Sequence, residues 1–126
     1  MLVSLIVRYI DNSIPLRLLI AECEHPATIL SALFFAKKYG IDRSLDISPL
    51  FETSISIERG ARILEQALDC KPFNQYINNR KRIAIQTGFS DAGRFMGQIT
   101  SSLAVERLQV KLAEIFQKKL SKKIEV

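Results

Sequence analysis

Leu45-Asp-Ile-Ser-Pro-Leu-Phe51, followed directly by Glu52-Thr53, is the stretch that decides the fold class. It is an apolar run of strand length, and Pro49 predicts that the regular strand ends near that residue, because proline cannot donate to a sheet ladder. Ser54 or Ser56 is expected to cap a helix that follows. The sequence therefore predicts a buried strand, an acidic residue and then a helix.

Two further units of the same kind flank this stretch. Before it, the apolar run Leu16–Ala21 precedes a helical pattern that starts at Pro26. After it, the run Arg82–Thr87 leads through a glycine-bracketed turn to a long helix, predicted from about Phe95 to Lys119. Alternation of strands and helices predicts an α/β class with parallel strands. Two architectures remain open: a small open sheet, or an arc of a larger (β/α)₈ barrel, which typically needs about 250 residues.

Acidic residues follow two of the three predicted strands. Glu52 ends the central run, and Asp91 lies in the turn after Thr87. Ligands of parallel α/β sheets collect at the carboxyl ends of the strands, where two carboxylates can share one Mg²⁺ or Mn²⁺ ion. Taken singly, each acid is better explained as an ordinary residue of a turn, a helix cap or a first helical turn, where Asp and Glu are common.

Two motifs at these strand ends resemble phosphoenolpyruvate carboxylase. They are Pro49-Leu-Phe-Glu-Thr53 and Gly88-Phe-Ser-Asp-Ala92, and the resemblance extends from about Leu16 to Phe116. It implies that Glu52 and Asp91 are the metal-binding carboxylates. It also places Arg94, near the predicted start of the long helix, where the family has a lysine, as a contact for phosphate or bicarbonate.

The resemblance also implies a fold and a reaction. The fold would be three consecutive βα units with parallel strands, an arc of a TIM-like barrel that ends in a long helix. The reaction would join phosphoenolpyruvate and bicarbonate to give oxaloacetate and phosphate, which feeds the tricarboxylic acid cycle. We expect residues 1–126 to form one partial domain, with 1–14 as a lead-in and 117–126 as a basic tail.

Two parts of the family enzyme have no counterpart in this sequence: the segment with its essential histidine, and its mobile loop rich in glycine and arginine. His25 does not match that histidine. We therefore expect the chain to be a piece of such an enzyme and to be inactive by itself. It would work with the remainder of the carboxylase chain or with a complementary polypeptide.

Composition agrees with one globular domain. The 126 residues are 48% hydrophobic and 25% charged, and no apolar run reaches the length of a membrane span. No secretory signal pattern is present, so we expect a cytoplasmic protein with no membrane partner and with Cys23 and Cys70 as reduced thiols.

The net charge of +5 leaves an alternative function open: a non-catalytic basic module that binds nucleic acid or another polyanion. Its main motivation is the lysine-rich stretch Gln117–Lys123. We favour a solvated helix end for these lysines, because no aromatic residues interleave with them, and nucleic acid is not an expected partner.

Overall fold

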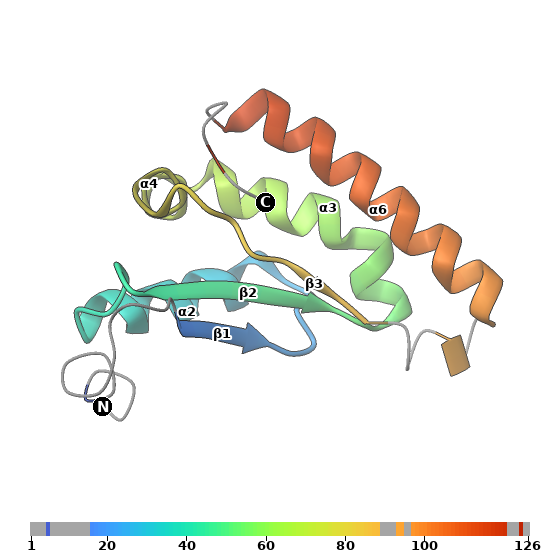
Figure 1. Ribbon diagram of the computed structural model, residues 1–126, viewed down its shortest axis with the longest axis horizontal. Helices are drawn as coiled ribbons and strands as arrows, with labels where there is room; N and C mark the ends of the chain where they lie inside the picture. Colours follow the sequence, from blue (N-terminus) through green and yellow to red (C-terminus); the bar gives the residue numbers. More distant parts are fainter. Residues whose placement is uncertain (1–4, 6–15, 89–92, 95–96, 121–123, 125–126) are drawn as a thin grey trace.

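The computed structural model describes residues 5, 16–88, 93–94, 97–120 and 124. Within these residues, strands and helices alternate as shown in Figure 1. The elements are β1 (Leu16–Ile20), α2 (Pro26–Lys38), β2 (Leu45–Phe51), α3 (Ser54–Asp69), α4 (Lys71–Arg80), β3 (Gln86–Thr87) and α6 (Gln98–Lys119). The predicted α/β class is therefore confirmed for the described part of the chain.

The three strands form one parallel sheet in which the spatial order equals the chain order, β1-β2-β3. On one side of β2, Leu16 pairs with Leu45 and Ile20 with Pro49. On the other side, Leu50 pairs with Gln86 and Phe51 with Thr87. The carboxyl ends of β2 and β3 consequently meet at one edge of the sheet.

The helices α2, α3 and α6 form a layer on one side of this sheet. Helix α2 contacts β2 and α3, and α3 contacts β2 and α6, which lies beside it in Figure 1. Gly60 permits the close packing of α3, since a Cβ atom there would lie 3.1 Å from Phe51 Cγ and 3.2 Å from Leu108 Cδ1. The core cluster has members on β2 and on all four helices α2, α3, α4 and α6.

Strand β2 does not end near Pro49, contrary to the prediction. It continues to Phe51, because Pro49 lies where a ladder bond is not needed. In a parallel pair, alternate residues direct their backbone groups to the same neighbour. The bond from Gly88 N–H to the Phe51 carbonyl, 3.0 Å, shows that the odd-numbered residues of β2 face β3. Pro49 is among these residues, and the β2–β3 ladder begins only at Leu50.

Strand β3 is shorter than the predicted run Arg82–Thr87. It comprises only Gln86 and Thr87, and Arg82 forms an isolated bridge. The Tyr76 hydroxyl of α4 occupies the first part of this side of β2: it donates to the Leu45 carbonyl at 2.7 Å and accepts from Ile47 N–H at 2.9 Å. These backbone groups are therefore not available to a longer β3.

Helix α6 begins at Gln98, three residues later than predicted. Gly97 precedes it with a φ of 80°, a conformation that interrupts a right-handed helix. Arg94 lies before this break, in a short helical turn with Gly93, so it is not at the start of the long helix as expected. Among the described helices, none is long and apolar enough to cross a membrane.

Candidate functional site

The edge formed by the carboxyl ends of β2 and β3 contains Glu52, which follows β2 directly. Glu52 lies against Gly88, the first residue after β3: a Cβ atom at Gly88 would be only 3.0 Å from Glu52 Cβ. The glycine therefore lets the turn after β3 start directly beside the acidic residue. We refer to Glu24, Glu52, Thr53 and Gly88 as the carboxyl edge.

The backbone of Glu52 is held by the cap of α3. Ser56 Oγ accepts hydrogen bonds from the N–H groups of Glu52, at 3.1 Å, and Thr53, at 3.0 Å. In return, Thr53 Oγ1 accepts from Ser56 N–H at 3.1 Å, so Thr53 is the N-cap and neither Ser54 nor Ser56 is. The half-buried Glu52 carboxylate makes no hydrogen bond or ion pair with any residue that the structure describes. A rigid backbone thus presents a carboxylate that remains available to a ligand.

Glu24 is a further acid at this edge, which the sequence reasoning did not single out. It lies in the loop after β1, and its Oε1 accepts a hydrogen bond from Thr53 Oγ1 at 3.1 Å. The carboxyl ends of β1 and β2 are thereby joined next to Glu52. Its place shortly after the first strand was the only sequence signal that could have identified it.

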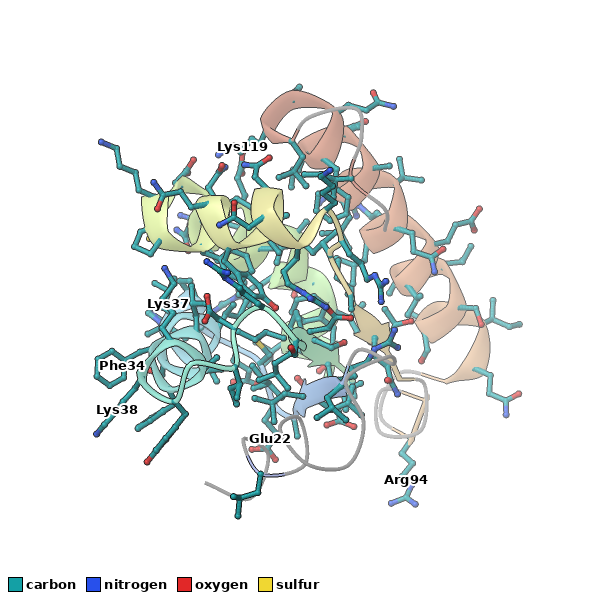
Figure 2. The ribbon with its side chains drawn as sticks, turned by 60° about the vertical axis from the view of Figure 1, so that its left-hand side comes forward. Glu22, Phe34, Lys37, Lys38, Arg94 and Lys119 are labelled. Carbon is teal, nitrogen blue, oxygen red and sulfur yellow. The ribbon has the colours of Figure 1, made fainter. Side chains whose placement is uncertain are left out.

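The other two predicted site residues are Asp91 and Arg94. Asp91 lies in residues 89–92, outside the part that the structure describes. Arg94 is exposed, and Figure 2 shows its side chain extending away from the body of the protein. No group of three or more His, Cys, Asp or Glu side chains that could hold a metal occurs among the described residues, which exclude Asp91.

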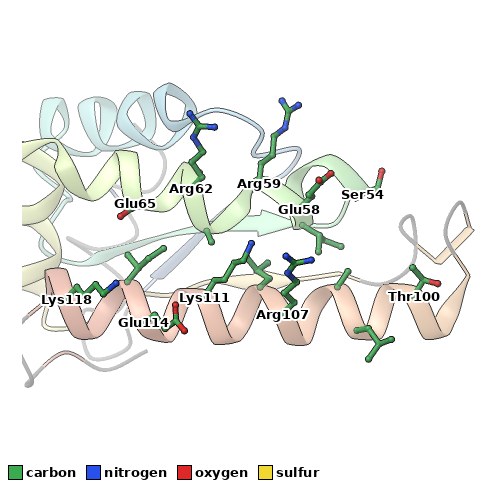
Figure 3. A pocket seen from close by; sticks show the side chains of 16 residues that line it. Ser54, Glu58, Arg59, Arg62, Glu65, Thr100, Arg107, Lys111, Glu114 and Lys118 are labelled. Atoms are coloured by element: carbon green, nitrogen blue, oxygen red, sulfur yellow. The ribbon is translucent and has the colours of Figure 1, made fainter.

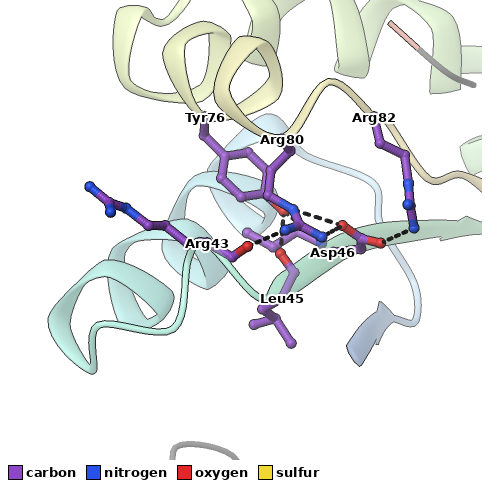
Figure 4. Close-up of polar contacts among 7 residues, drawn as sticks. Arg43, Leu45, Asp46, Tyr76, Arg80 and Arg82 are labelled. Atoms are coloured by element: carbon purple, nitrogen blue, oxygen red, sulfur yellow. Dashed lines mark hydrogen bonds and ion pairs between the residues drawn. The ribbon is translucent and has the colours of Figure 1, made fainter. Parts of the chain in front are cut away.

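The opposite, amino end of the sheet contains a buried ionic cluster that the sequence analysis also missed (Figure 4). Asp46 Oδ1 accepts from Arg80 Nε at 2.9 Å, and Asp46 Oδ2 accepts from Arg82 Nη1 at 3.1 Å. Arg80 also donates to the carbonyl of Arg43. Asp46 is 4% exposed. Together with Tyr76, we call Asp46, Arg80 and Arg82 the amino-end cluster.

Tyr76 completes this cluster through the two backbone bonds of its hydroxyl. Burial raises the pKa of the Tyr76 hydroxyl above its ordinary value of 10.0. The neutral hydroxyl is therefore the form that the fold favours, as its role as both donor and acceptor requires. The cluster fixes the start of β2 against α4.

Two side chains near the carboxyl edge have structural explanations. Cys23 is fully buried, and burial raises the pKa of its thiol to about 11. His25 caps α2, since its Nδ1 accepts from Ala27 N–H at 3.1 Å. Both cysteines are free thiols, as expected. Neither Cys23 nor His25 is therefore a candidate for acid–base chemistry.

The basic end of the chain also behaves as a helix terminus where it is described. Lys118 and Lys119 form the last turn of α6, and Lys119 forms ion pairs with Glu65, at 3.5 Å, and with Asp69. The hydrogen bond to Asp69 raises the pKa of Lys119. Lys122 and Lys123 lie outside the described residues.

A groove of about 1010 Å³ lies between α3 and α6 (Figure 3). All of its lining residues belong to these two helices, and Glu52 and Arg94 are not among them. Charges of both signs line it, including Arg107 and Lys111 of α6 and Glu58 of α3. Apolar side chains of both helices also line it, so it is the space between two neighbouring helices that pack together.

Sheet and edge together define a class: parallel α/β proteins with an acidic residue at the carboxyl edge, where such proteins bind ligands. Comparison with known families specifies the class further. The model of the family described as phosphoenolpyruvate carboxylase matches residues 6–123. The chain therefore belongs to the phosphoenolpyruvate carboxylase family.

Individual relatives agree with this assignment. A phosphoenolpyruvate carboxylase from Marinomonas sp. (strain MWYL1) is 29% identical over 99 residues, which are 79% of this chain and 11% of the relative. The enzyme of the same name from Thermus sp. (strain 71) is 27% identical over 95 residues, 71% of this chain and 11% of that protein. The phosphoenolpyruvate carboxylase from Corynebacterium efficiens is 29% identical over 96 residues, which are 69% of this chain and 10% of that protein. The chain thus spans about a tenth of the length of these relatives.

Proposed function

We propose that this chain supplies the metal-binding edge of a phosphoenolpyruvate carboxylase and acts together with the remaining parts of that enzyme. The observation that supports the proposal is the close approach of Gly88 to Glu52, because Gly88 precedes Asp91 by only three residues in the chain. The reaction would convert phosphoenolpyruvate and bicarbonate into oxaloacetate and phosphate, in the cytoplasm. The remainder of the enzyme would be the rest of a carboxylase chain or a complementary polypeptide.

In this proposal, Glu52 and Asp91 hold a Mg²⁺ or Mn²⁺ ion. Oxygen ligands suit both ions, and the two carboxylates would leave the other coordination positions for water and substrate oxygens. When bound, the ion would supply electrostatic stabilisation of the negative charge that develops on the substrate. The Ser56 cap would keep the Glu52 backbone fixed while the carboxylate binds.

Arg94 would contact phosphate or bicarbonate. Its planar guanidinium offers two parallel donors, which suits an oxyanion. Because the Arg94 side chain extends away from the body of the protein, this role needs the surrounding enzyme to direct Arg94 toward the substrate.

The strand order supports a barrel arc as the architecture. In a (β/α)₈ barrel, successive strands are parallel neighbours and the helices form one outer layer. The order β1-β2-β3 has this arrangement, and α2, α3 and α6 lie on one side of the sheet. An open sheet wound in two directions would instead place helices on both sides.

A chimeric enzyme tests the proposed function. Residues 16–116 of this chain would replace the matching segment of the Marinomonas carboxylase, and oxaloacetate formation would be measured. We expect an active chimera in which Glu52→Gln and Asp91→Asn each lower kcat/KM at least about 100-fold. Glu58→Gln, the same change at an exposed position of α3, is the matched control and should leave the rate unchanged.

The isolated chain should show no carboxylase activity, because it lacks most of the enzyme's residues. A folded chimera in which Glu52→Gln and Asp91→Asn retain the full rate would refute the assignment of these residues. A clear rate of oxaloacetate formation by the pure chain would refute the need for further polypeptide.

A further inference from the structure

Glu24 lies in a loop whose backbone is constrained just before it. Glu22 has a φ of 49°, a left-handed conformation that non-glycine residues rarely adopt, and the Glu24 N–H donates to the Glu22 carbonyl at 2.8 Å. Between these two residues, Cys23 is fully buried and anchors the loop. Strained residues persist only where the surrounding structure holds them, and they cluster at functional sites. The loop therefore gives the exposed Glu24 a fixed position after β1.

In this position, the Glu24 carboxylate lies beside the Thr53 hydroxyl. That hydroxyl has one proton and, among the described residues, two acceptors within reach: Glu24 Oε1 at 3.1 Å and Ser56 Oγ at 3.0 Å. The number of lone pairs decides between these acceptors. Ser56 Oγ has two, and it already accepts from the N–H groups of Glu52 and Thr53, while its own proton goes to the Thr53 carbonyl at 3.0 Å. The Thr53 proton therefore goes to Glu24.

We propose that Glu24 is a positioning residue for Glu52, the proposed metal ligand. By accepting the Thr53 proton, Glu24 leaves both lone pairs of Ser56 Oγ to backbone N–H groups. One of these N–H groups belongs to Glu52, so the point from which the Glu52 side chain starts is fixed. Without an acceptor at position 24, the Thr53 hydroxyl would compete for Ser56 Oγ and weaken that bond. The inference rests on the proposed function, and it adds a residue after β1 to a site formed after β2 and β3.

A purely structural role of Glu24 makes a different prediction. A negative charge beside the N-terminus of α3 would stabilise that helix through its dipole. Glu24→Gln removes the charge but keeps a side-chain oxygen that can accept the Thr53 proton, whereas Glu24→Ala removes both. Glutamine can therefore replace glutamate in the positioning role, but not in a role that depends on charge.

Amide hydrogen exchange of the metal-free full chain tests the proposal. We expect Glu24→Ala to speed exchange at the Glu52 amide about fivefold, the size that the loss of one hydrogen bond gives, and Glu24→Gln to keep the wild-type rate. Glu22→Ala is the matched control, because it removes the other acid of the same loop. It should also keep the wild-type rate, since the Glu22 side chain makes no hydrogen bond or ion pair with any described residue.

A Mn²⁺ titration of the same variants, followed by NMR, measures the consequence for the site. Glu24→Ala and Glu22→Ala each lose one negative charge from the loop, so a difference between them does not come from net charge. We expect the dissociation constant for Mn²⁺ to be about fivefold higher in Glu24→Ala than in Glu22→Ala. Glu24→Gln should bind Mn²⁺ as tightly as Glu22→Ala.

Unchanged exchange at Glu52 in Glu24→Ala would overturn the proposal, and so would an unchanged Mn²⁺ affinity of that variant. Equal acceleration in Glu24→Gln, or equal acceleration at Ile57, whose N–H donates to the Thr53 carbonyl at 2.9 Å, would show instead that the charge stabilises the start of α3. A wild-type chain that binds no Mn²⁺ would refute the proposed function. The exchange rates of the metal-free chain would still decide whether Glu24 positions the Glu52 backbone.

Discussion

The two ends of the sheet differ in how their charged side chains are satisfied. At the amino end, Asp46 is 4% exposed and receives hydrogen bonds from two arginines. At the carboxyl edge, Glu52 is held through its backbone, and its carboxylate has no partner within the described residues. In parallel α/β folds, residues at the amino end of the strands serve stability, whereas those at the carboxyl end serve ligand binding. We therefore propose that the amino-end cluster serves stability and that the carboxyl edge serves ligand binding.

The largest expected effect separates these two roles directly. Asp46→Asn should lower the free energy of unfolding by about 3 kcal/mol, because it leaves Arg80 and Arg82 without a buried counter-charge. Glu52→Gln should change it by less than about 0.5 kcal/mol. Urea unfolding of both variants measures the difference. Equal losses would show that the two ends do not have different roles.

Tyr76→Phe should lower the free energy of unfolding by about 2 kcal/mol, since it leaves the buried Ile47 N–H and Leu45 carbonyl without a hydrogen-bond partner. The raised pKa adds a pH dependence. Stability from the neutral hydroxyl is complete below the ordinary value of 10.0 and decreases as the pH rises through the raised value. The stability advantage of the wild type over Tyr76→Phe should therefore shrink above pH 10. An advantage that stays constant would contradict this account.

At the carboxyl edge, Gly88→Ala should have a smaller effect on stability, about 1 kcal/mol, because the new Cβ would meet Glu52 Cβ at 3.0 Å. The same displacement should weaken metal binding. Gly93→Ala is the matched control, since a Cβ there meets only Ser101 Oγ, at 4.0 Å. Thermal unfolding and Mn²⁺ titration of both variants provide the measurements. If Gly88→Ala changed neither the stability nor the Mn²⁺ affinity, this would contradict the close approach of the two strand ends.

The smallest effect concerns thiol reactivity. At pH 8, iodoacetamide should modify Cys70 well before Cys23, because Cys23 is fully buried and its thiol pKa is raised to about 11. Peptide mass spectrometry over time measures the two rates. Fast alkylation of Cys23 in the folded protein would show that the loop after β1 opens, and that the carboxyl edge is less rigid than its hydrogen bonds indicate.

The sequence predicted the alternation of strands and helices and the position of Glu52 at the end of a strand. Both follow from local patterns of apolar residues. It predicted neither the Glu24–Thr53 bond nor the Arg80–Asp46 pair, because these join residues 29 and 34 positions apart with no local signature. Contacts of this kind depend on how the units pack.

Tyr76 explains why the predicted strand Arg82–Thr87 was too long. Its apolar residues do bury side chains: Ile83 is 1% exposed. Buried side chains alone do not extend the hydrogen-bonded pairing of β3 with β2, however. The Tyr76 hydroxyl bonds to two of the β2 backbone groups that a longer β3 would need. An interaction from a separate helix thus decided the length of the strand.

Paramagnetic broadening by Mn²⁺ tests the central claim most directly. The backbone amide resonances of the isolated chain would be recorded by NMR during a Mn²⁺ titration. We predict that Glu52, Gly88 and Asp91 broaden first and together, and that Glu52→Gln and Asp91→Asn each abolish this pattern, while Glu58→Gln preserves it. Broadening centred elsewhere, or a pattern at the carboxyl edge that persists in both variants, would contradict the claim that these two carboxylates hold one ion.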